Sequence, residues 1–147
     1  MTNGSTAKKT ESTRGYRGAD IPMSAICRFA REVAERFRPD KIILFGSHAY
    51  GTPRDDSDVD ILVVMPARNQ LDQAGRIRLA VPRAFPMDLI VRTPENLRWR
   101  LEEGDWFLRE IVSRGKVLYD KANARLGAQS RKRSRTRSRR RRTSQTG

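Results

Sequence analysis

The amino-acid sequence predicts an α/β fold of the α+β kind, in which helices pack on a small mixed β-sheet. Short apolar runs rich in β-branched residues indicate buried strands, and longer segments with apolar residues at helical spacing lie between them. These patterns are confined to residues 21–122 of a 147-residue chain, a length that can bury one modest core. The sequence therefore predicts one folded domain.

The first predicted elements are a helix and two strands. Pro22 suits the first turn of the helix and Pro39 ends it, while the apolar residues between them share one face. The runs at 41–45 and 59–64 have the length and the β-branched content of buried strands. Residues 71–81 follow as a weaker helix, because their apolar spacing is less regular.

The second half of the domain continues this alternation. Residues 87–91 form a predicted third strand, Pro94 opens a helix, and Asp105 is the expected N-cap of a further helix that ends at Gly115. Residues 116–119 are a candidate last strand. Large aromatic side chains of this region are predicted to belong to the core, with a base-stacking platform as the alternative: Trp99, Trp106 and Phe107.

Charge divides the chain into three parts. Residues 21–122 hold 17 basic and 15 acidic residues, a net charge of +2. Residues 1–20 are polar without an apolar period, and residues 123–147 hold ten basic and no acidic residues, so we expect both segments to be disordered. Nine of those ten lie within 131–142. The basic tail is either a passive solvated segment or a site that binds nucleic acid by counterion release.

Several classes of protein are excluded. No run of about 18 apolar residues exists and the first twenty residues lack an apolar core, so we expect neither a transmembrane helix nor a secretory signal. Cys27 is the only cysteine, which rules out an intrachain disulfide and a multi-cysteine zinc site. We expect a cytoplasmic protein that has no membrane partner.

The segment from Gly46 to Asp60 carries the chemistry. It starts where the 41–45 strand ends, with Gly46, Ser47 and a predicted short helical turn. Free amide groups at such a turn can hold phosphate oxygens, glycine lets the backbone approach closely, and the serine hydroxyl adds a donor. His48, the only histidine, lies in this turn, where it could contact the substrate; we favour a surface or capping role and assign it no general-base task.

Two carboxylates follow the turn. Asp58 and Asp60 are two residues apart on a strand, so their side chains leave the same face, with Cα atoms about 6.5–7 Å apart. Neighbouring carboxylates repel unless a cation lies between them, and oxygen ligands suit Mg²⁺. Two such ions can flank an in-line phosphoryl or nucleotidyl displacement. Asp88 begins the next strand and could add a third ligand or accept the proton of an attacking hydroxyl.

This pattern resembles the DNA polymerase β-like nucleotidyltransferase superfamily, whose signature is Gly-Ser, a spacer and Asp-x-Asp, and within it the minimal nucleotidyltransferases. The resemblance covers roughly residues 21–120, and Asp88 matches the third carboxylate of the family. Tyr50 stands where many relatives carry a basic residue. The positions that match the signature of the minimal enzymes are Gly46, Ser47, Gly51, Ser57, Asp58 and Asp60.

The resemblance implies a polymerase β-like palm and Mg²⁺-dependent nucleotidyl transfer, with AMP from ATP as the first expectation. It assigns triphosphate binding to Gly46 and Ser47 and the binding of two Mg²⁺ ions to Asp58, Asp60 and Asp88, and it also gives Asp88 the deprotonation of the acceptor. Stand-alone minimal nucleotidyltransferases commonly act as antitoxins, and some add AMP to a tyrosine of a HEPN ribonuclease toxin. The acceptor could instead be a small molecule such as an aminoglycoside or an RNA end, or the chain could be a non-catalytic module that masks a partner.

Overall fold

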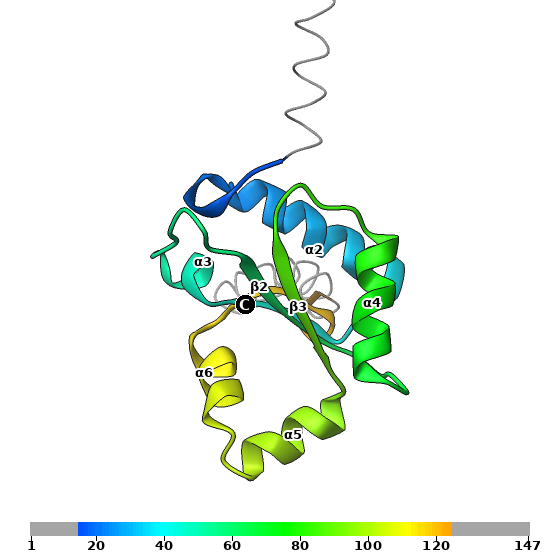
Figure 1. Ribbon diagram of the computed structural model, residues 1–147. Coiled ribbons are helices and arrows are strands. Elements are labelled where there is room, and N and C mark those ends of the chain that lie inside the picture. Colours follow the sequence, from blue (N-terminus) through cyan, green and yellow to red (C-terminus); the bar gives the residue numbers. More distant parts are fainter. Residues whose placement is uncertain (1–14, 125–147) are drawn as a thin grey trace, which may run out of the picture.

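The computed structural model describes residues 15–124, so the predictions for 1–14 and 125–147 lie outside the described residues. Helices and strands follow one another along nearly all of this part of the chain (Figure 1). In chain order they are the 3-10 helix η1 (Gly18–Asp20), α2 (Met23–Phe37), β1 (Lys41–Phe45), α3 (Ser47–Tyr50), β2 (Val59–Val64), α4 (Gln70–Ala80), β3 (Met87–Arg92), α5 (Pro94–Glu102), α6 (Trp106–Arg114) and β4 (Lys116–Asp120).

The four strands form one mixed sheet in the order β3-β2-β1-β4. Strand β1 pairs antiparallel with β2 and with β4, whereas β2 and β3 are parallel and are connected through α4. This arrangement confirms the small mixed sheet with packed helices. The predicted strands at 41–45 and 59–64 have the bounds expected, and the third strand extends one residue further, to Arg92.

Helices cover both faces of the sheet (Figure 1). The larger core joins α2 and α4 to one face, and a smaller core joins α5 and α6 to the other. Strand β2 contributes to both, because successive side chains of a strand point to opposite faces: Ile61 and Val63 lie in the larger core, and Leu62 and Val64 in the smaller one. This two-sided burial explains why β2 is a continuous apolar run after Asp60.

Side-chain caps fix where the later helices begin. Thr93 accepts a hydrogen bond from the amide of Asn96 at the start of α5, and Asp105 accepts one from the amide of Leu108 at the start of α6. The predicted N-cap role of Asp105 is therefore confirmed. Each such cap satisfies an amide that lacks an intrahelical partner and stabilises a helix by about 1 kcal/mol.

The prediction that three aromatic residues lie in the core is wrong. The exposed fractions are 56% for Trp99, 71% for Trp106 and 42% for Phe107. For Trp106 and Phe107 the period of α6 explains the error, because Leu108 and Ile111 already fill the side that faces the sheet. Apolar character was a poor guide to burial here.

Residues 15–20 also differ from the prediction that they are disordered. The amide of Tyr16 donates to the carbonyl of Ala84 at 2.6 Å, and Gly18 is buried within η1. This segment has no apolar period, so its packing is not visible in the sequence. No helix within residues 15–124 is long and apolar enough to cross a membrane.

Candidate active site

Strand β1 ends in the turn that the Gly-Ser motif occupies. Gly46 precedes α3, which is a single short turn. The amides of Ala49 and Tyr50 both donate to the carbonyl of Gly46 at 3.0 Å. Because the amides of Ser47 and His48 come before the first intrahelical bond, the helix itself provides no partner for them.

Gly46 is required both by its backbone conformation and by a neighbour. Its φ of 77° lies in the region that side-chain-bearing residues rarely adopt. A Cβ atom at this position would also collide with Oδ2 of Asp60. The glycine therefore allows the turn to lie directly against a carboxylate of the neighbouring strand.

Asp60 and Asp88 lie side by side on neighbouring strands. They are paired in the register of β2 with β3, and Asp60 is opposite Phe45 of β1. Residues paired in this way point to the same face, which is the face that α5 and α6 cover further along the strands. Asp58 comes two residues before Asp60 and is exposed, as is Asp88. The structure thus places the Asp60 carboxylate against the turn that holds Gly46, with Asp88 paired to Asp60 on β3 and Asp58 two residues before it.

The surroundings of Asp60 disfavour the ionised form of its carboxyl group. Burial raises the pKa of Asp60 from 3.8 to about 6, the Asp88 and Asp58 carboxylates add to the rise, and His48 opposes it. The positive charges of residues 15–124 therefore do not fully compensate the negative charge of the ionised Asp60 side chain. A divalent cation would supply that compensation and restore the ionised form.

The three carboxylates fit a Mg²⁺ ion that also binds substrate phosphates. Within the described part of the chain, no group of three or more His, Cys, Asp or Glu side chains is arranged as a ready metal cage. Mg²⁺ usually takes one or two protein carboxylates and completes its shell with substrate phosphates and water. Asp60 with Asp58 and Asp88 suits that mode of binding rather than an all-protein cage.

Comparison with known proteins gives the chain its family. Residues 26–119 match the family described as the nucleotidyltransferase domain. The chain belongs to this family. It is therefore a nucleotidyltransferase, which confirms the resemblance to the polymerase β-like superfamily that rested on the Gly-Ser and Asp-x-Asp motifs.

Two similar proteins span most of the same region. Over 98 residues, 65% of this chain and 95% of the relative, the sequence is 31% identical to a protein of Methanocaldococcus jannaschii named "Putative protein adenylyltransferase". A crystal structure of a "putative nucleotidyltransferase" from Sulfolobus solfataricus has a TM-score of 0.46 and 21% identity, and covers 66% of this chain and 78% of that chain. The family match at 26–119 includes every residue of the candidate site.

His48 of this nucleotidyltransferase is buried, so the prediction of a surface position is wrong, whereas its ring contacts backbone carbonyl oxygens as a capping side chain does. Its side chain lies between two backbone oxygens, and the residue is 7% exposed. Nδ1 is 3.1 Å from the carbonyl oxygen of Asp58, and Nε2 is 2.8 Å from that of Gly18. The ring therefore connects the turn that holds Gly46 and Ser47 to the residue before β2 and to η1. Gly18 is 30 residues earlier in the chain, and no sequence pattern indicates this contact.

Helix α6 borders the nucleotidyltransferase site with a cation and an aromatic ring. The guanidinium carbon of Arg114 lies 4.2 Å from the centre of the Tyr50 ring. A positive charge therefore reaches the turn from α6, although position 50 itself carries none. Phe107 packs edge-on against Phe45 at a centroid distance of 5.7 Å, and Phe45 is the strand partner of Asp60.

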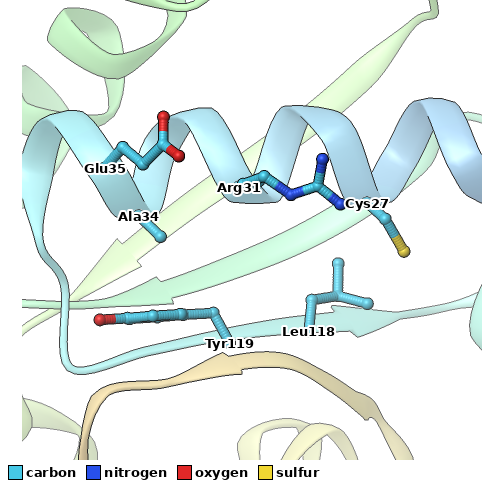
Figure 2. A pocket seen from close by; sticks show the side chains of 6 residues that line it. All are labelled: Cys27, Arg31, Ala34, Glu35, Leu118 and Tyr119. Atoms are coloured by element: carbon cyan, nitrogen blue, oxygen red, sulfur yellow. The ribbon is translucent and has the colours of Figure 1, made fainter. Parts of the chain in front are cut away.

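A pocket of about 490 Å³ lies away from this site, between α2 and β4 (Figure 2). It is on the side of the sheet that α2 covers, whereas the carboxylates are on the opposite side. None of the predicted site residues lines it. The lining residues are Cys27, Arg31, Ala34, Glu35, Leu118 and Tyr119.

Proposed function

We propose that this nucleotidyltransferase transfers AMP from ATP to a tyrosine hydroxyl of a protein acceptor in the presence of Mg²⁺. The observation that carries the proposal is the position of Asp60. Its carboxylate is paired in register with Asp88, lies against Gly46 of the turn and has a pKa raised to about 6. Such a cluster of undercompensated carboxylates beside a phosphate-binding turn is suited to a substrate that brings both phosphates and a cation.

The turn after β1 supplies the groups that hold the triphosphate. Gly46 gives the turn its positive-φ backbone conformation, and the Ser47 hydroxyl donates to a phosphate oxygen. The amides of Ser47 and His48 are further donors, because α3 offers them no intrahelical partner. Arg114, stacked on Tyr50, adds positive charge at the end of this turn.

In the proposed reaction, the acceptor oxygen attacks the α-phosphorus of ATP. The bond from that phosphorus to the oxygen bridging it to the β-phosphate breaks, and pyrophosphate leaves. Asp88 takes the proton of the attacking hydroxyl, a role for which its exposed position at the start of β3 is suited. Asp58, Asp60 and Asp88 would hold the Mg²⁺ ions, of which we expect two; the ions would neutralise the charge that develops on the phosphoryl oxygens.

The protein acceptor is supported by the relative from M. jannaschii, whose name gives a protein adenylyltransferase activity. The resemblance to minimal nucleotidyltransferases further suggests a HEPN toxin as the acceptor and an antitoxin role for this chain. We expect the reaction to take place in the cytoplasm. An RNA end or an aminoglycoside-like molecule as the acceptor is an alternative outcome of the experiment below.

The experiment incubates the full-length protein with Mg²⁺, ATP labelled at the α-phosphate, and a HEPN-type protein encoded by a neighbouring gene. We expect label on a tyrosine of that protein. The label should be lost in Asp60→Asn and retained in Asp56→Asn, a matched change in an exposed loop. Label on RNA or on an aminoglycoside would correct the acceptor. ATP binding without transfer to any acceptor would contradict the proposed activity and indicate a binding module.

A further inference from the structure

Three buried polar atoms at the junction of β3 and α5 have no hydrogen-bond partner within residues 15–124. They are Nε of Arg92, Oδ1 of Asn96 and Nε of Arg100. Arg92 ends β3, and Asn96 and Arg100 are four residues apart on α5, so they share one side of that helix. Buried polar groups are normally paired, so unpaired ones require an explanation; an anion could pair with the arginine donors but not with the Asn96 oxygen, which is an acceptor.

The cluster also carries an excess of positive charge. Burial lowers the pKa of Arg92, the charge of Arg100 lowers it further, and Asp105 opposes the change. Asp105 is 3.3 Å from Arg100, but its other carboxylate oxygen accepts the amide of Leu108 at the start of α6. Two guanidinium groups therefore share one carboxylate that is partly engaged elsewhere.

The position of the cluster relates it to the active site. Alternation along β3 places Arg92 on the same face as Asp88, at the other end of the strand. Four residues of strand separate their Cα atoms by about 13 Å. The Arg100 side chain is 41% exposed although its Nε is buried, so a group from solution can reach the exposed part of this side chain. The face that carries the catalytic carboxylates thus ends in a cationic pair.

We propose that Arg92 and Arg100 bind a carboxylate of the acceptor protein. This inference rests on the proposed transfer to a protein, and it adds a determinant of acceptor choice. Guanidinium groups pair with carboxylates through two parallel hydrogen bonds, and such a partner would compensate both the burial and the mutual repulsion of the two arginines. An extended peptide advances about 3.4 Å per residue, so an acidic residue about four positions from the reactive tyrosine matches the spacing of Arg92 from Asp88 and is the spacing to test.

A single acidic side chain fits better than a nucleic acid. The cluster has one excess positive charge, and residues 21–122 have a net charge of only +2. A nucleic-acid backbone instead needs a row of cations along its phosphates. An isolated arginine pair therefore suits one anionic group rather than a row of phosphates.

The experiment compares two labelled peptides that contain one tyrosine and differ only four residues away, where one has glutamate and the other glutamine. Binding to the full-length protein is measured by fluorescence anisotropy with Mg²⁺ and a non-hydrolysable ATP analogue. We expect the glutamate peptide to bind about tenfold more tightly. Arg92→Gln and Arg100→Gln should each remove most of this preference. Arg98→Gln, an exposed arginine on the same helix, should retain it.

Several outcomes would overturn the inference. Equal affinity for the two peptides would overturn it. An unchanged preference for the glutamate peptide in a folded Arg100→Gln protein would also overturn it, and this variant remains informative if Arg92→Gln does not fold. Loss of binding to a labelled RNA, rather than to the glutamate peptide, would assign the arginines to nucleic acid. The transfer assay distinguishes the two proposals. If the glutamate preference is preserved but no tyrosine is labelled, only the proposed function is contradicted. If both peptides are labelled at equal rates, only the carboxylate site is contradicted.

Discussion

Replacing Asp60 by asparagine should stabilise the unliganded protein while it abolishes nucleotidyl transfer. Asparagine keeps the size of the side chain and removes a charge that burial, Asp88 and Asp58 all disfavour. The pKa of Asp60 is about 6 in the folded protein against 3.8 ordinarily, so its protonated form stabilises the fold. That contribution is complete below about pH 4 and is lost as the pH rises through about 6.

The size of the effect follows from the shift of the Asp60 pKa. A rise of about two pKa units corresponds to about 3 kcal/mol at 1.36 kcal/mol per unit. Because Asp60 is only partly shielded from water, screening reduces the expected gain in the free energy of unfolding to about 1 kcal/mol. For a domain of about 100 residues, this raises Tm by about 4–8 °C at about pH 7.5. Near pH 4 the gain should vanish, since the natural side chain is then protonated.

Thermal unfolding followed by circular dichroism, in a chelator and at both pH values, measures this difference. Asp56→Asn, in the exposed loop, is the control and should leave Tm unchanged at both. Added Mg²⁺ should raise the Tm of the natural protein more than that of Asp60→Asn. A variant that is less stable than the natural protein at about pH 7.5, or equally shifted at both pH values, would refute the electrostatic explanation.

Three further changes test other parts of the site and the basic tail. Gly46→Ala should lower the free energy of unfolding by about 1–2 kcal/mol and weaken Mg-ATP binding, because the φ of 77° and Oδ2 of Asp60 both oppose a Cβ atom. Urea unfolding and calorimetric titration measure these two effects, and an unchanged affinity for ATP would place the phosphates elsewhere. His48→Phe leaves the carbonyl oxygens of Gly18 and Asp58 without the imidazole as a partner. We therefore expect the free energy of unfolding to fall by about 1–3 kcal/mol and kcat to fall by a larger factor than KM for ATP rises. Full activity would show that the ring does not position Asp58. Deletion of residues 123–147 removes ten basic residues and should abolish most binding to RNA and duplex DNA while transfer to a protein acceptor persists; equal nucleic-acid affinity at two salt concentrations would contradict this role of the tail.

The strands were predictable because their burial is recorded directly in the sequence. Covering both faces of β1 and β2 demands uninterrupted apolar residues, and both runs have the expected bounds. Asp105 was predictable as an N-cap for a similar reason, since its function depends on residues only three positions away. Local physics therefore sufficed for most of the elements.

Features that depend on distant residues were not predictable. The burial of His48 requires Gly18 and the carbonyl of Asp58 to meet it from two sides, and neither contact leaves a periodic pattern. The exposure of Trp106 depends on which side of α6 the sheet occupies. For the site, the motif predicted that Asp60 and Asp88 belong together. Their register and the contact of Asp60 with Gly46 could not be predicted, because both depend on how the strands assemble into the sheet.

The order of strands in the sheet has a consequence for how the protein is made. A nascent chain that has reached the end of β2 already contains Gly46, Ser47, Asp58 and Asp60, but β3 has not yet been synthesised to supply Asp88. The outer edge of β1 stays open longer still, because its second partner is β4, the last strand. Pairing between such distant segments is slow, and an open strand edge can pair with other chains. Translation must therefore pass residue 120 before the sheet closes, and a product truncated before β4 would combine an incomplete sheet with a tendency to aggregate.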